Sequence, residues 1–274
     1  MRKSPTPLVD IGLNLANKSF AADQQQILEH ALECGVQHCV LTGTDATTSE
    51  IVAELCQQYA EQFPNMLYCT AGVHPHHASE WNSNSSELIR QLAKQRQVVA
   101  IGETGLDFNR NFSQPADQQR AFEQQLQLAT ELQLPVFMHE RDAHQRQLEI
   151  IKEYRDQLVD GVIHCFTGSR EALFNYLDLD LHIGITAWVC DERRGTELQQ
   201  LVSNIPLQRL MLESDAPYLL PRNIEPMPKE LKRSRRNEPA FLPWVLKEVS
   251  HRYGEPEDEI AAATTATAKR FFRI

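Results

Sequence analysis

The stretch that decides the fold is Val98–Asp107, which reads VVAIGETGLD. Its first residues, 98–101, are apolar or small and are followed by a glycine, a pattern typical of a strand buried on both faces. Glu103 comes next, and a bare carboxylate at the end of a buried strand is costly unless its charge is compensated. Two interpretations are open: Glu103 lies in water or pairs with an arginine, or it is a metal ligand at the mouth of a barrel.

Short apolar runs alternate with helical stretches along the whole chain. The expected strands cover residues 8–15, 36–41, 67–73, 98–101, 134–138, 161–163, 182–186 and 210–212. The expected helices cover residues 25–34, 49–62, 86–95, 116–132, 148–154, 169–177, 196–203, 239–253 and 257–272, with loops over 107–115 and 218–238. This alternation, without a linker or a break in composition, predicts an α/β fold: a single (β/α)8 TIM barrel that occupies residues 1–274 as one domain.

The composition is that of a globular, acidic protein. The chain has 274 residues, of which 42% are hydrophobic, and a formal net charge of -10, which disfavours long-range attraction to duplex nucleic acid. No apolar run approaches the roughly 20 residues of a membrane span, and no apolar signal segment follows the N-terminus. We therefore expect no membrane partner and a cytoplasmic location. Six cysteines without a C-x-x-C pair argue against a zinc ribbon and against a disulfide scaffold.

Chemistry in (β/α)8 barrels lies at the carboxyl ends of the strands. The ends of the expected fourth, fifth, sixth and eighth strands carry Glu103, His139, His164 and Asp215. Because these ends converge on one mouth, residues that are distant in sequence can share a single ion. Two imidazoles and a carboxylate suit zinc, manganese or iron, whereas magnesium prefers more oxygen ligands. The pattern therefore predicts a divalent metal site on these residues.

Other polar residues near the same mouth are candidates for substrate binding. Arg141 lies two residues beyond His139, on the same face of the strand. It either holds a phosphate beside the ion or pairs with a neighbouring carboxylate. Arg110 follows the fourth strand, and His74 and His76 follow the third, so we expect these residues to assist at the same mouth.

Two further features are open to a functional or a structural interpretation. The segment 222–238 is a basic island on an acidic protein, and it is either a solvated, mobile loop or a clamp on a phosphate backbone. Phe108, Phe112 or Trp188 either stacks an unpaired base, which is worth ~1–3 kcal/mol, or packs under its own loop.

Taken together, the motifs at the strand ends resemble the signatures of the TatD family, metal-dependent deoxyribonucleases on an amidohydrolase-like barrel. The stretches that carry the resemblance are AGVHPH at 71–76, IGETGLD at 101–107, PVFMH at 135–139, HCFTG at 164–168 and ESDAPYL at 213–219. They occur in the family's order, and the resemblance runs from about residue 9 to residue 272. RRNEP at 235–239 resembles the family's late motif, and NRNF at 109–112 and WVCDERRG at 188–195 resemble the branch after which the family is named.

The resemblance implies a hydrolase of phosphodiester bonds: a 3′-to-5′ exonuclease on single-stranded DNA or RNA ends, with magnesium in activity and a role in the repair of oxidative DNA damage. It assigns metal binding to Glu103, His139 and His164, and a metal or catalytic role to Asp215. Zinc or manganese also fits the site, and Asn237 in the late motif is a candidate for substrate binding. We expect the ion on Glu103, His139 and His164 to polarise a phosphoryl oxygen and to lower the pKa of a bound water. Asp215 would orient or deprotonate that water, and Glu103 and Asp215 are the expected catalytic residues.

One motif departs from the family pattern. Most relatives open with Asp-x-His-x-His on the first strand, where this chain has Asp10, Gly12 and Asn14. Gly12 offers no ligand and Asn14 only a weak carbonyl oxygen, so we expect one firm metal site and a second that is weak, substrate-assisted or absent. The alternatives are an amidohydrolase-like esterase, such as a D-aminoacyl-tRNA deacylase, and a catalytically impaired nucleic-acid-binding barrel. We expect the protein to be a monomer.

Overall fold

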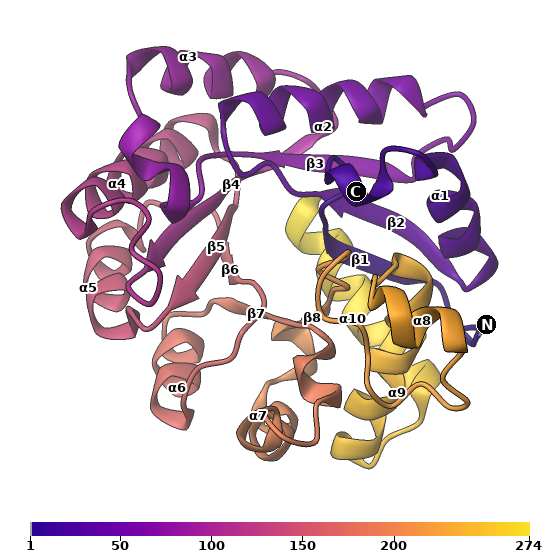
Figure 1. Ribbon diagram of the computed structural model, residues 1–274. Helices are drawn as coiled ribbons and strands as arrows, with labels where there is room; N and C mark the ends of the chain where they lie inside the picture. The colour runs from indigo at the N-terminus through magenta and orange to yellow at the C-terminus, as the bar shows by residue number, and fades with distance from the viewer. Residues whose placement is uncertain (1) are drawn as a thin grey trace.

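The computed structural model describes residues 2–274, apart from the side chain of Glu230, and its strands follow one another around a ring (Figure 1). All neighbouring strands are parallel, and their order is β1 to β8. The strands are β1 (Leu8–Leu13), β2 (Val36–Leu41), β3 (Leu67–Ala71), β4 (Val98–Asp107), β5 (Val136–Arg141), β6 (Gly161–Ile163), β7 (His182–Ile185) and β8 (Leu210–Leu212). A bridge between Leu13 and Ala216 brings the first strand to the segment after the last one. The predicted (β/α)8 barrel is confirmed.

Helices lie between the strands and around the barrel. The α-helices are α1 (Gln24–Glu33), α2 (Ala46–Gln58), α3 (Ser83–Leu92), α4 (Pro115–Leu132), α5 (His144–Tyr154), α6 (Arg170–Asp178), α7 (Thr196–Leu201), α8 (Lys229–Ser234), α9 (Leu242–Tyr253) and α10 (Glu257–Phe272). Short 3-10 helices are η1 (Lys18–Phe20), η2 (Pro75–Glu80), η3 (Ala187–Cys190), η4 (Val202–Asn204), η5 (Leu207–Arg209) and η6 (Pro239–Phe241). Within residues 2–274, no helix combines the length and the apolar character that crossing a membrane requires.

β4 is longer than predicted, and the difference corrects the sequence-based boundary at residue 101. Gly102 and Gly105 have φ angles of +134° and +133°, a region that glycine enters without steric cost. The glycines therefore bend the strand instead of ending it, and pairing with β5 continues to Asp107. As a result, Glu103 lies within the strand and not in the loop after it.

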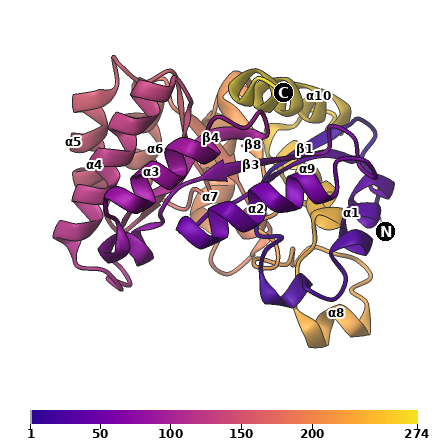
Figure 2. The ribbon, with the colours of Figure 1, turned by 90° about the horizontal axis from the view of Figure 1, so that it is seen from above.

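A second correction concerns the segment 218–238, which was expected to be a loop throughout. Lys229–Ser234 forms the helix α8. Its lysine, glutamate, leucine and arginine residues are good helix formers, and the fixed φ of Pro228 suits the position just before the first turn. In Figure 2, α8 and α10 lie at opposite edges of the molecule.

The amino-terminal end of the barrel is filled with apolar side chains and is covered by α10. This smaller core contains Val9, Ile11, Val40, Val99, Ala100, Phe137, Val162 and Met211 from the strands, with Ala268, Phe271 and Phe272 from α10. The larger core lies between the strands and the outer helices. Because apolar packing occupies the amino-terminal end, polar chemistry is placed at the carboxyl ends of the strands.

Candidate active site

A pocket of about 770 Å³ opens at the carboxyl ends of the strands. Segments that follow or end every strand of the barrel contribute to its lining. The predicted site residues that line it are His74, His76, Glu103, Arg110, His139, Arg141, His164 and Asp215.

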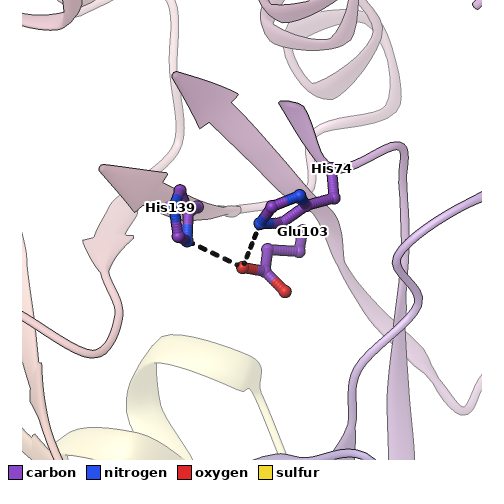
Figure 3. Close-up of side chains that lie close together, drawn as sticks. All are labelled: His74, Glu103 and His139. Atoms are coloured by element: carbon purple, nitrogen blue, oxygen red, sulfur yellow. Dashed lines mark ion pairs between the residues drawn. The ribbon is translucent and has the colours of Figure 1, made fainter. Parts of the chain in front are cut away.

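One carboxylate oxygen is the meeting point of three imidazoles. Oε1 of Glu103 lies 2.7 Å from Nε2 of His164, 3.1 Å from Nδ1 of His139 and 3.3 Å from Nε2 of His74. Figure 3 shows His74 and His139 directed at this carboxylate from two sides. The backbone N–H of Glu103 donates to the carbonyl of Gly43 at 2.7 Å and so fixes the bend of β4. Burial alone would raise the pKa of Glu103, but the imidazoles hold it well below its usual range, so the carboxylate is ionised.

His139 and His164 each face a second carboxylate with the other ring nitrogen. Nε2 of His139 is 3.6 Å from Oδ2 of Asp107, and Nδ1 of His164 is 3.3 Å from Oε2 of Glu213. Burial opposes protonation, yet the acidic partners raise the pKa of both imidazoles. Since a carboxylate only accepts hydrogen bonds, both nitrogens of each ring donate when no ion is bound. An ion held between Glu103 and the two rings would replace the proton on each inner nitrogen, while the outer nitrogen would keep its proton toward Asp107 or Glu213.

His74 is bonded differently. Its Nδ1 accepts the backbone N–H of His76 at 3.0 Å, and burial lowers the pKa of His74 to about 4. The ring is therefore neutral at pH 7, and its one proton is on Nε2, the nitrogen that faces Glu103. His74, Glu103 and His139 bring ligand atoms within 4.8 Å of one another, but His74 in this bonding state is a hydrogen-bond donor with no lone pair to spare.

The donor set fits a divalent metal ion. Two imidazole nitrogens, from His139 and His164, converge on an ionised carboxylate oxygen, and nitrogen with oxygen donors suits zinc or manganese. The outer carboxylates of Asp107 and Glu213 resemble the partners that orient metal-binding histidines in other proteins.

Asp215 follows β8 and lines the same pocket. Burial raises its pKa to about 7, and Nδ2 of Asn14 donates to its Oδ1 at 3.0 Å. Its φ of +51° is in the left-handed region, which is uncommon outside glycine and is found at functional sites more often than elsewhere. A carboxylate with a pKa near neutrality is suited to proton transfer at neutral pH.

Gly12, the position that departs from the family pattern, borders a buried carboxylate. Glu213 is 0% exposed, and the backbone N–H of Cys165 donates to its Oε1. A Cβ at Gly12 would lie 2.6 Å from Oε2 of Glu213, and a Cβ at Gly184 would lie 2.7 Å from Oε1. Glycines on β1 and β7 therefore leave room for this carboxylate, which occupies the space next to the first strand.

Three arginines, Arg110, Arg141 and Arg194, make part of the lining basic. Nη1 of Arg141 donates to Oγ1 of Thr167 at 3.1 Å. The guanidinium carbons of Arg141 and Arg194 lie 5.7 Å and 4.5 Å from the ring centroid of Trp188. Arg141 makes no ion pair with a described carboxylate, so most of its donors remain for an anion in the pocket.

The basic segment 222–238 does not cover the pocket. Its Arg222 pairs with Glu192 at 2.6 Å, and its Arg236 pairs with Asp23 at 2.7 Å. Among the described residues, no cation of this segment lines the pocket. The geometry does not support the interpretation of this segment as a phosphate clamp over the site.

Asn237 is also outside the lining. Its side chain is buried, and Nδ2 donates to the carbonyl of Ser214 at 2.8 Å. It thus supports the backbone that carries Asp215. Two acidic residues that the sequence analysis did not single out, Asp107 and Glu213, lie directly behind the imidazoles. Gly12 is the sequence signal that could have indicated Glu213, because a glycine inside a strand often marks a place where another group approaches the backbone closely.

A parallel eight-stranded barrel with imidazoles and carboxylates at the carboxyl ends of its strands belongs to the class of metal-dependent, amidohydrolase-like hydrolases. Comparison of the sequence with known families identifies the family within this class. The family described as TatD related DNase matches residues 9–273. This chain belongs to that family, and the resemblance predicted from its motifs is confirmed.

Similar proteins span the full length of the chain. The 3′-5′ ssDNA/RNA exonuclease TatD of Citrobacter koseri is 49% identical over 267 residues, which cover 97% of this chain and 99% of that protein. The protein of the same name from Escherichia coli K12 is 47% identical, with coverage of 97% and 99%. The crystal structure of YJJV, a TatD homolog from Escherichia coli K12, matches with a TM-score of 0.85 at 27% identity and covers 97% of this chain and 98% of its own.

Proposed function

We propose that this chain is a metal-dependent 3′-to-5′ exonuclease that hydrolyses phosphodiester bonds at the ends of single-stranded DNA and RNA. The observation that carries the proposal is the convergence of His139 and His164 on Oε1 of Glu103 in a pocket lined by arginines. The names of relatives that share nearly half of the sequence support the polarity and the substrate. We further propose that the chain acts as a single domain and as a monomer.

Glu103, His139 and His164 would hold the ion, because each directs a potential ligand atom toward the same point. Binding of the ion would displace the protons from the inner nitrogens of the two imidazoles. When bound, the ion polarises a phosphoryl oxygen and lowers the pKa of a water molecule. Magnesium is the ion we propose for activity, and zinc or manganese suits the two nitrogen donors better. The carboxylate of Glu213 occupies the space beside Gly12, which supports one firm ion site over two.

The carboxylate of Asp215 accepts the proton of the attacking water. Its raised pKa makes it a stronger base than an ordinary aspartate while leaving it largely ionised just above neutral pH. The hydrogen bond from Asn14 occupies Oδ1 and leaves Oδ2 for this proton. His74 donates from Nε2, so it orients the Glu103 carboxylate or a phosphoryl oxygen placed beside it.

Arg141 and Arg110 bind the phosphate groups that flank the reacting bond, because both residues line the pocket and guanidinium groups pair well with phosphate. Nε2 of His76 is held 2.6 Å from Oδ2 of Asp107 and stands at the same wall, where it assists substrate binding. We assign Asn237 a positioning role, since it bonds the backbone next to Asp215 and does not line the pocket.

A substrate panel tests this function. Metal-stripped protein is supplied separately with Mg²⁺, Mn²⁺ and Zn²⁺ and offered a single-stranded oligonucleotide, a duplex and a D-aminoacyl-tRNA. We expect the single strand to be cut with at least one ion and the ester to be spared. Cleavage of the ester alone would favour the esterase alternative, and binding of the strand without turnover under every ion would favour a catalytically impaired barrel.

A further inference from the structure

Two aromatic side chains at the pocket mouth are unusually exposed. Among the described residues, the exposed large hydrophobic side chains are Leu32, Ile51, Phe112 and Tyr218. Leu32 and Ile51 are on the outer helices α1 and α2, whereas Phe112 and Tyr218 line the pocket. The latter two are also the most exposed, at 67% and 54%. Leaving an aromatic ring in water forfeits the gain from burying it, so a ligand that covers both rings would recover that gain.

The loops that carry these two rings leave the barrel from opposite strands. Phe112 follows β4 and Tyr218 follows β8, and in an eight-stranded barrel with sequential order the fourth and eighth strands face each other across the axis. Glu103 and its imidazoles belong to the pocket that the two rings flank. A nucleic-acid strand whose phosphate lies at Glu103 can therefore direct the nucleotide on each side of that phosphate toward a different ring.

Each ring is attached to the rim by contacts that leave much of it uncovered. The ring centroid of Phe112 lies 4.8 Å from that of His76 in an edge-to-face arrangement. The hydroxyl of Tyr218 accepts a hydrogen bond from Nδ2 of Asn17 at 3.1 Å, and its backbone N–H donates to the carbonyl of Asp215 at 3.0 Å. Both residues are thus connected directly to residues of the pocket while more than half of each stays exposed.

Trp188, the other aromatic residue of the rim, is a poorer platform. The guanidinium groups of Arg194 and Arg141 already lie over its ring, at 4.5 Å and 5.7 Å from the centroid, and its side chain is only partly exposed. One guanidinium group, that of Arg110, also lies over the ring of Phe112, at 5.9 Å from the centroid. Phe112 nevertheless stays far more exposed than Trp188, so it is the better platform.

We propose that Phe112 and Tyr218 are stacking platforms for the two nucleobases on either side of the reacting phosphodiester, a substrate subsite that rests on the proposed exonuclease function. A planar base covers an aromatic ring and is bound without hydrogen-bond readout, so the platforms accept any sequence. Bases inside a duplex are already stacked on each other and paired. Only an unpaired end can place its bases on two separate rings, which gives the pocket its preference for single strands.

Binding and hydrolysis by double-mutant cycles test the platforms. The protein variants are Phe112→Ala and Tyr218→Ala, with Tyr218→Phe as the conservative variant and Leu32→Ala and Ile51→Ala as matched exposed controls. The oligonucleotides carry an abasic site at the terminal position, at the penultimate position or at neither. Affinity is measured by fluorescence anisotropy with a phosphorothioate strand that resists cleavage, and KM with the ordinary strand.

We expect each alanine variant to weaken binding of the intact strand about 5- to 150-fold, with little change for Tyr218→Phe and for the two controls. Each variant should be insensitive to one abasic position and remain sensitive to the other, because removing the ring or its base breaks the same contact. The platforms would be overturned if the loss of affinity from an alanine variant and the loss from an abasic site simply multiplied at both positions. They would also be overturned if the alanine variants bound the strand as tightly as the wild type does. If the wild-type protein binds strands and its variants show this coupling to the abasic positions, but no strand is cut, the exonuclease function would be overturned while the platforms would stand.

Discussion

The carboxylate of Glu213 offers a sharp test of how the metal site is prepared. Its Oε1 accepts the backbone N–H of Cys165, and its Oε2 faces Nδ1 of His164 at 3.3 Å. In the variant Glu213→Gln, the amide oxygen must stay with Cys165, since a backbone N–H can only donate. The amide NH2 group is then turned toward Nδ1 of His164, which must accept. The proton of a neutral His164 moves to Nε2, the nitrogen that would otherwise bind the ion.

The expected loss of metal affinity follows from the position of Glu213 behind His164. Removing an outer partner of a metal-binding histidine costs about 10- to 100-fold in metal affinity, or roughly 1.4–2.7 kcal/mol. Glu213→Gln keeps the size of the side chain and fits between Gly12 and Gly184 as glutamate does. We therefore expect the change to act through the His164 tautomer with little disturbance of the packing.

Isothermal titration of Mn²⁺ and Zn²⁺ into metal-stripped protein measures the affinity, and ¹⁵N NMR of the histidines reports the tautomer. Glu131→Gln is the matched control, because Glu131 pairs with Arg90 on the surface at 2.6 Å and such pairs contribute little. Urea unfolding verifies that both variants are folded. An affinity within about threefold of the wild type, with the His164 proton still on Nδ1, would refute the reasoning.

Three further predictions concern the carboxylates around this site. Burial raises the pKa of Asp10 from 3.8 to about 7, so between these values the folded state holds a proton that the unfolded state releases. The free energy of unfolding should therefore fall on the order of 3–4 kcal/mol as pH rises from about 4 to about 7. Asp10→Asn should flatten this part of a urea-unfolding series, and an unchanged slope would contradict the assignment. Gly12→Ala should cost about 1–3 kcal/mol of stability by overpacking, and most of that cost should vanish in a Glu213→Ala background; additive costs in chemical denaturation would argue against the contact. Asp215→Asn should slow hydrolysis by about 10²–10⁴-fold and remove the rise of activity that deprotonation of Asp215 produces as pH increases through about 7; a pH–rate profile in which the rise persists would exclude Asp215 as the base.

The barrel was predictable because its signals are local. Apolar runs bounded by glycine and polar residues mark each strand, and the residues that follow them include Glu103, His139, His164 and Asp215. The boundary at residue 101 was wrong since glycine ends many strands, and sequence does not tell a bend with positive φ from a stop.

The partners behind the imidazoles were not predictable in this way. Glu213 meets His164 across 49 residues of sequence, and Asp107 meets His76 across 31 residues. Neither pairing has a periodic signal, because both depend on which side chains a closed barrel brings together. The same holds for His74, whose role depends on a hydrogen bond from the backbone N–H of His76 that a motif does not reveal.

The most direct test of the central claim uses one single-stranded oligonucleotide labelled at its 5′ end and, separately, at its 3′ end. Metal-stripped wild-type protein and the Glu103→Ala variant are compared after addition of Mg²⁺, Mn²⁺ or Zn²⁺, with thermal unfolding to confirm that both are folded. We predict a ladder of shortened 5′-labelled strands and early release of the 3′ label as a mononucleotide, both lost in Glu103→Ala. Intact strands under every ion, or equal ladders from the wild type and a folded Glu103→Ala variant, would contradict a metal-dependent 3′-to-5′ exonuclease centred on Glu103.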